Sequence, residues 1–211
     1  MKTFIKTLFA AALTTVVLSS ATLAANASEN NSSYTALTQV KNISKIVVSG
    51  NVKLILVQDS REGVEVYDQY YSKNALIQQQ GAELRISSFT KDALTIIAHV
   101  NNLSSVEASN TSKVFTSGSF NLLDLKIVLK DQATAAINAN TVTLSTSVND
   151  AASLKLEGST ENHEATLGSE AKMKMDDFTA QNTNISVIAK PVLASNNRYA
   201  DLQPELLEKL F

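Results

Sequence analysis

Residues that could carry out acid–base chemistry are scattered along this 211-residue sequence. Carboxylates are spread from residue 124 to residue 177, and the only adjacent pair among them is Asp176 and Asp177. Neighbouring residues of a strand point to opposite faces, so this pair cannot act together on one bond unless it lies in a turn. The three arginines, Arg61, Arg85 and Arg198, are also far apart in the sequence. This pattern gives no indication of a glycosidase or a polysaccharide lyase.

Metal, nucleotide and nucleophile sites also lack a recognisable pattern. His99 and His163 are the only histidines, and their spacing is not that of metal ligands. We expect His163 to be an ordinary hydrogen-bonded histidine. The sequence has no cysteine, no Gly-x-Ser-x-Gly motif and no glycine-rich phosphate loop. It therefore predicts no catalytic residue, no metal site and no cofactor, and it does not predict an enzyme.

The remaining candidates are residues that could bind a ligand. Tyr67, Tyr70 and Tyr71 lie close together before a glutamine run, and such rings can stack on sugars. The alternative is a loop or a single helical turn whose rings cover an end of the core.

Polar residues also alternate with apolar ones in the second half of the chain, and these could form rows of hydrogen-bond donors on a flat strand face. The alternative is that they only keep the surface hydrated and prevent strands from pairing between molecules. The predicted binding face consists of Lys126, Thr143, Ser145, Lys172, Lys174 and Ser186.

These polar positions belong to a repeat of about twenty residues. Short polar residues recur at its corners, and small or apolar residues lie two and four positions before each corner. The corner residues are Asn110, Asp131, Asp150, Ser169 and Pro191. Such units cannot close a core alone, but stacking would align Leu129 with Val148 and Leu167. We therefore predict an all-β, stacked-strand right-handed β-helix; a sandwich of consecutive hairpins is the alternative.

The two ends of the predicted β domain, residues 40–196, differ from the repeat. Before it, shorter apolar runs at intervals of roughly ten residues predict irregular N-terminal strands, with Ser49-Gly50-Asn51 as a tight turn between two of them. After it, residues 197–211 form a predicted capping tail. Pro204 to Phe211 has leucines on one side and is expected to be a short amphipathic helix that covers the last strand.

The N-terminus has the features of an export signal. Two lysines precede an apolar run, and Ala25-Asn26-Ala27 fits the small-x-small cleavage rule. Residues 1–27 are therefore a predicted signal peptide and residues 28–39 a polar leader. With a net charge of −2 and no basic patch, nucleic-acid binding is not expected. No span after Ala27 is long enough to cross a membrane as a helix, and we expect a periplasmic or cell-surface protein.

Several segments resemble the head-GIN domain family of auto-transporter adhesins, which is common in exported proteins of Bacteroidetes. The likeness is carried by residues 46–54, 81–86 and 103–110, and by corners such as Ser109-Asn110-Thr111-Ser112. This resemblance implies a β-helical or stacked-β fold and an exported location, and it implies no chemistry.

The sequence thus favours a non-enzymatic, exported interaction module with an unknown glycan or protein ligand. Two alternatives stay open. One is a glycan-active β-helix enzyme, and the other is a periplasmic envelope factor with a protein partner.

Overall fold

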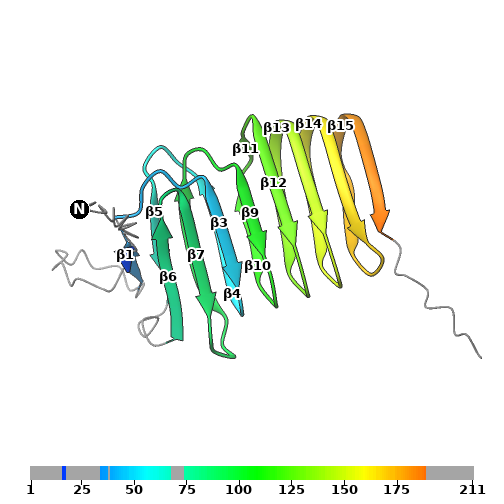
Figure 1. Cartoon of the computed structure of the whole chain (residues 1–211). Coiled ribbons are helices and arrows are strands. Elements are labelled where there is room, and N and C mark those ends of the chain that lie inside the picture. Colours follow the sequence, from blue (N-terminus) through cyan, green and yellow to red (C-terminus); the bar gives the residue numbers. More distant parts are fainter. Residues whose placement is uncertain (1–15, 18–33, 38, 68–73, 189–211) are drawn as a thin grey trace, which may run out of the picture.

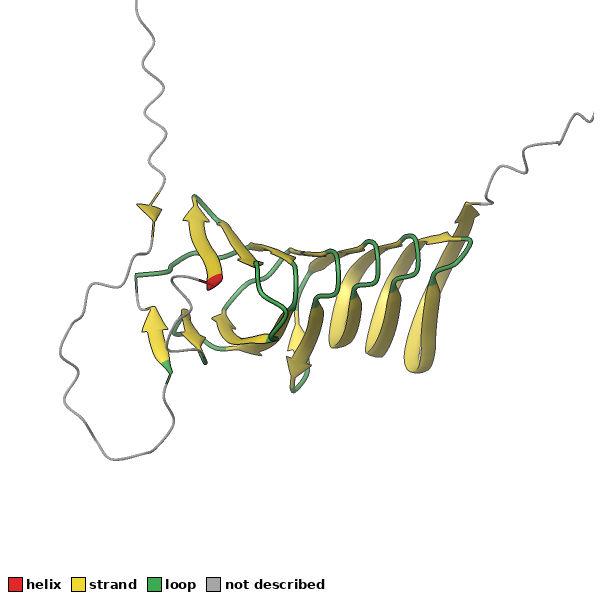
Figure 2. Cartoon of the chain, turned by 90° about the horizontal axis from the view of Figure 1, so that it is seen from below, coloured by secondary structure: helices red, strands yellow, loops and turns green. Residues whose placement is uncertain are grey.

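The computed structural model describes residues 16–17, 34–37, 39–67 and 74–188. In this part of the chain the strands all belong to one 15-stranded sheet. Figure 1 shows the strands side by side along the length of the molecule, and Figure 2 shows that the sheet curls into two layers. The all-β fold class is therefore confirmed.

The second half of the chain is built from long strands that each belong to both layers. β13 pairs in parallel with β14 over its whole length at an offset of 19 residues, from Thr134↔Ser153 to Val148↔Leu167. β14 pairs in the same way with β15, with a bulge between Lys155 and Glu157. The strands of this half are β9 (Ser105–Ala108), β10 (Lys113–Ser117), β11 (Phe120–Asn121), β12 (Asp124–Leu129), β13 (Thr134–Val148), β14 (Ser153–Gly168) and β15 (Lys172–Ile188).

Each long strand bends in its middle, and this bend makes the two layers. The first half of β13 pairs with β10, and its second half pairs with β12. From β10 the sheet continues through β4, β8, β5 and β2, whereas from β12 it continues through β9, β3, β7, β6 and β1. We call the layer that contains β10 the first layer and the layer that contains β12 the second layer.

The N-terminal strands do not stack in sequence order. β3 lies between β7 and β9, and β4 lies between β8 and β10, all in parallel. The strands near the end of the sheet, β2, β5 and β6, pair antiparallel. These strands are β1 (Val16–Val17), β2 (Thr35–Leu37), β3 (Lys45–Ser49), β4 (Val52–Gln58), β5 (Gly63–Val66), β6 (Ala75–Gln80), β7 (Glu83–Ser88) and β8 (Leu94–Val100).

The core lies between the layers and follows from the alternation of side chains along each strand. The inward residues of successive strands align, so that Leu129, Val148 and Leu167 are neighbours in one layer and Ala135, Leu154 and Met173 in the other. Most of these side chains are fully buried in β12 to β14. Because the chain contains no cysteine, no disulfide can stabilise the fold, and packing between the layers must do so.

The corners explain why asparagine and aspartate recur there. Asn110, Asp131 and Asp150 have φ angles of 59°, 59° and 53°, a left-handed conformation that these residues tolerate better than most. The backbone N–H of Asn110 donates to Oδ2 of Asp131 at 2.8 Å, and the N–H of Asp131 donates to Oδ2 of Asp150 at 3.1 Å. These two hydrogen bonds therefore link the three successive corners to one another.

Several predictions for the ends need correction or lie outside the described residues. The polar leader, residues 28–39, contains a strand, because Thr35–Leu37 pairs with β5. The glutamine run that follows the tyrosines belongs to a strand, Ala75–Gln80. Of the predicted signal peptide, only Val16–Val17 is described, and it pairs with β6. The corner residue Pro191 and the helix expected from Pro204 to Phe211 lie outside the described residues.

Candidate binding groove

A regular lattice of polar side chains covers the outer face of the second layer. Pairing aligns Lys126 of β12 with Ser145 of β13, Glu164 of β14 and Asn184 of β15. Strand neighbours are about 4.8 Å apart, so this row presents a polar group at each such step. The next outward row, about 7 Å further along the strands, contains Ser147, Thr166 and Ser186.

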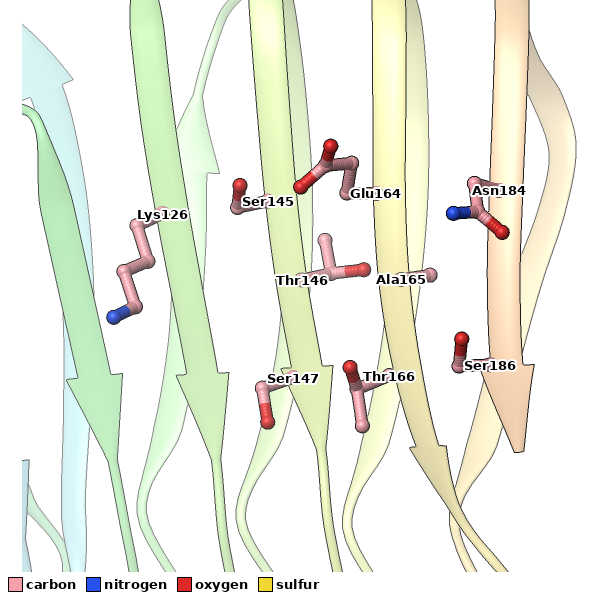
Figure 3. Close-up of a pocket in the computed structure, with 9 residues that line it drawn as sticks. All are labelled: Lys126, Ser145, Thr146, Ser147, Glu164, Ala165, Thr166, Asn184 and Ser186. Atoms are coloured by element: carbon pink, nitrogen blue, oxygen red, sulfur yellow. The ribbon is translucent and has the colours of Figure 1, made fainter. Parts of the chain in front are cut away.

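The two rows border a shallow groove of about 320 Å³. Figure 3 shows the lining side chains on four successive strands, with the Lys126 ammonium on one side and Asn184 and Ser186 on the other. The lining residues are Lys126, Ser145, Thr146, Ser147, Glu164, Ala165, Thr166, Asn184 and Ser186.

The polar groups of this groove are largely free of partners within the protein. Over the described ranges, neither the Lys126 ammonium nor the Glu164 carboxylate has a hydrogen bond or ion pair, and the same holds for Asn184. Ser147 is an exception, because its hydroxyl accepts a hydrogen bond from Asn149 at 3.1 Å. The groove therefore offers a donor cation, an acceptor carboxylate and hydroxyls that an incoming polar ligand could engage.

The charged residues of these two rows are paired with each other at the other end of the rows. Lys126 aligns with Ser105 of β9 and, beyond it, with Lys45 of β3. The Lys45 Nζ atom lies 2.7 Å from Glu107 Oε1 and 3.2 Å from Glu83 Oε2, and these hydrogen bonds raise the pKa of Lys45. The outer face thus has a self-neutralised part over β3, β7 and β9 and an unpaired part over β12 to β15.

The residues predicted as one binding face are divided between the two layers. Lys126, Ser145 and Ser186 line the groove. Thr143 lies on the same half of β13 as Ser145, in register with Asp124 and outside the groove lining.

Lys172 and Lys174 are the misplaced members of that set. They lie on the first half of β15, where they pair with Ser153 and Lys155 of β14 in the other layer. The prediction of a single face was therefore wrong for these two lysines, because β15 bends between its halves and alternation alone does not reveal a bend. The sequence reasoning also missed Glu164, Thr166 and Asn184, although Glu164 follows Ser145 by the 19-residue repeat interval.

The predicted tyrosine patch is described only at Tyr67, because Tyr70 and Tyr71 lie outside the described residues. The Tyr67 ring stacks on Tyr34, with centroids 5.3 Å apart. Its hydroxyl donates to Glu65 Oε2 at 3.0 Å, and this hydrogen bond raises the pKa of Tyr67. Tyr34 reaches this position because β2 pairs with β5, a contact that no local sequence pattern indicates.

The two histidines do not form a metal site. Across the described residues, no group of three or more His, Asp or Glu side chains is arranged to hold a metal ion. His163 is buried, with Nε2 3.0 Å from the Thr146 hydroxyl and its ring edge against Phe178. The predicted hydrogen bond of His163 is confirmed at Nε2, whereas its buried Nδ1 atom has no hydrogen-bond partner among the described residues.

Burial of His163 leads to a prediction for stability at acidic pH. Desolvation lowers the pKa of its imidazole below the usual 6.5, so the unfolded chain takes up a proton more readily than the folded one. The contribution of the neutral His163 imidazole to the free energy of unfolding is therefore fully present above about pH 6.5. This contribution is lost as the pH falls from there towards the lowered pKa, by up to about 1.4 kcal/mol per pH unit. Urea unfolding of the parent and of His163→Gln from pH 7.5 to pH 5 measures this effect. The difference in the free energy of unfolding between the parent and His163→Gln should shrink as the pH falls. If the two proteins lose stability in parallel, the prediction is wrong.

The family described as "Putative auto-transporter adhesin, head GIN domain" matches residues 42–190. A search of curated proteins gave no match. Over the described residues, no helix has the length and apolar character needed to cross a membrane.

Several solved structures share the fold. A putative adhesin from Bacteroides fragilis is 14% identical, with a TM-score of 0.62 over 74% of this chain and 76% of the other. A putative lipid binding protein from Parabacteroides distasonis is 11% identical, with a TM-score of 0.60 over 74% and 78% of the two chains. A putative adhesin from the same species is 13% identical, with a TM-score of 0.57 over 74% and 78%. At these identities the likeness concerns the fold alone.

Proposed function

Because the chain belongs to the head GIN domain family of putative auto-transporter adhesins, we propose that it is a non-enzymatic binding module that recognises a glycan or protein ligand through the groove of the second layer. The observation that carries this proposal is the contrast along the two outward rows. Their charges are paired with each other over β3, β7 and β9, and unpaired where the groove lies.

The chemistry of the groove suits a ligand rich in hydroxyl or amide groups. Lys126 can donate, Glu164 can accept, and the hydroxyls of Ser145 and Thr166 can do both. These side chains stand on paired strands, so little backbone freedom is lost when a ligand binds. A net contribution of about 1 kcal/mol from each good hydrogen bond would give useful affinity from a few simultaneous contacts.

The proposed role fits a rigid, stacked architecture. Each long strand passes through both layers, and we call one such passage a circuit. We infer that the circuits from β12 to β15 form a right-handed β-helix, because connections between parallel neighbours in one sheet are almost always right-handed. We also infer that residues 1–27 direct export, so that the groove acts in the periplasm or at the cell surface. Reading the protein as a binding module is consistent with the adhesin names of the neighbouring structures.

A binding screen tests the proposal. The purified protein would be applied to arrays of polysaccharides and of envelope and matrix proteins. Each ligand that retains the protein would then be recovered and analysed for cleavage. We expect at least one ligand that retains the protein and is recovered unchanged. Ser145→Arg, which fills the groove, should abolish retention, whereas Ser153→Arg on the other layer should not. Cleavage of the ligand would support the glycan-active alternative, and retention that survives Ser145→Arg would place binding elsewhere.

A further inference from the structure

The longest free strand edge among the described residues is that of β15, at one end of the stack. Within the described residues β15 pairs only with β14, so its other edge, over 17 residues, has no strand beside it. Figure 1 shows this strand as the last of the stack. A long unpaired edge presents a row of free backbone N–H and C=O groups that can pair with another strand.

The core is also uncovered at this end. Leu154 and Leu156 of β14 are fully buried, whereas Met173 and Met175 at the equivalent positions of β15 are only partly buried. In the other half of the strand, Val187 is 64% exposed. In the described part of the chain, β15 therefore has the same apolar inner face as the strands before it, and no following strand covers that face.

The opposite end of the sheet has only short free edges. There β1 has two residues and β2 has three, and Leu37, Val40, Ile43 and Ile77 are buried. A second copy that stacked head to tail would set the 17-residue edge of β15 against these short edges. An arrangement that joins two β15 edges matches their lengths, and such a self-complementary contact has twofold symmetry.

We propose that two copies of this chain join through β15, about a twofold axis parallel to the strands. The first half of β15 in one copy then runs antiparallel to the second half in the other, with Ala180 near the axis. This register places Met173 opposite Val187 and Met175 opposite Ile185, so that apolar residues meet across the seam. Both edges gain hydrogen bonds, which a helix packed on the edge could not provide.

Charge along the strand agrees with this register. The charged residues of β15, Lys172, Lys174 and Asp176 among them, all lie in its first half. In the proposed pairing they face Ile188, Ser186 and Asn184, so no like charges oppose each other. The grooves of the two copies would face opposite directions, and one dimer could bridge two ligands.

Cysteine cross-linking tests the arrangement directly, because the chain contains no native cysteine. Residues paired near the axis have Cα atoms about 5 Å apart, which suits a disulfide. Oxidised Ala180→Cys should run mainly as a covalent dimer on a denaturing gel. The matched control is Ser159→Cys, one circuit earlier and in register with Thr179, and it should stay monomeric.

Sedimentation of the full chain gives a second measurement. The parent should sediment as a dimer, and Val187→Glu should weaken association by about tenfold or more. Leu123→Glu replaces a similarly exposed residue away from this end and should have no effect. A parent that remains monomeric, as expected if residues 189–211 cover the edge instead, would overturn the proposal. A dimer in which Ala180→Cys fails to cross-link would overturn the proposed axis.

Discussion

Replacement of Leu154 by aspartate is expected to lower the free energy of unfolding by about 4 kcal/mol or more. Leu154 is fully buried in the first layer, where it lies between Ala135 and Met173 on the neighbouring strands. The substitution places a carboxylate without a partner in the apolar core, and it also removes the packing of the leucine. Urea unfolding at pH 7 measures the loss.

Ser153→Asp is the matched control, because Ser153 is the preceding residue and points outward. We expect it to change the free energy of unfolding by less than about 0.5 kcal/mol. If Leu154→Asp unfolds at nearly the same urea concentration as the parent, the assignment of inward and outward faces in β14 is wrong.

Gly158→Ala is expected to have the second largest effect. Gly158 lies in the middle of β14, with a φ of +99°. A Cβ atom at this position would lie 2.3 Å from the carbonyl oxygen of Ala139 on the adjacent strand. Because this neighbour is backbone, the strands themselves must shift, and we expect a loss of about 3 kcal/mol.

Gly118→Ala separates the steric contribution from the conformational one. Gly118 has a φ of +80°, yet a Cβ atom there would have no heavy atom within 4 Å. It should therefore lose only about 1–2 kcal/mol from the left-handed conformation. Thermal or urea unfolding of both variants gives the comparison, and equal losses would contradict close packing between the bends of β13 and β14.

Much of the fold could be predicted from local patterns, because the repeat places similar residues at similar positions. Alternation identified the inward residues Leu154 and Leu167, and the polar corners were predicted at Asn110 and Asp131, which adopt the left-handed conformation in the structure. Long-range pairing could not be predicted in this way. Nothing in the sequence near β3 indicates that it inserts between β7 and β9.

The site was harder to predict than the fold. Local alternation showed which residues point outward but not which layer they belong to, so Lys174 was grouped with Ser145 although the two lie on different layers. The 19-residue interval would have added Glu164 to the set, because it aligns Glu164 with Ser145. The pairing of Lys45 with Glu83 and Glu107, which distinguishes the two parts of the polar row, depends on strand order and could be recognised only in three dimensions.

Each layer contains both paired and unpaired exposed charges. In the first layer, Lys155 Nζ lies 2.7 Å from Glu157 Oε1 and 3.8 Å from Asp177 Oδ2. The hydrogen bond to Glu157 raises the pKa of Lys155. In the groove of the second layer, Lys126 and Glu164 have no such partner among the described residues. We place binding in the second layer because there an unpaired lysine and an unpaired carboxylate line the same groove.

The most direct test of the account compares the affinities of two double variants for a ligand obtained from the binding screen. Lys126→Ala with Glu164→Ala removes both charges of the groove, whereas Lys172→Ala with Lys174→Ala removes two charges from the other layer. Isothermal titration should show that the first variant binds about tenfold or more weakly than the parent, with the second unchanged. Equal affinities for the parent and the groove variant, or a loss confined to the Lys172 and Lys174 variant, would contradict the assignment of the groove as the binding site.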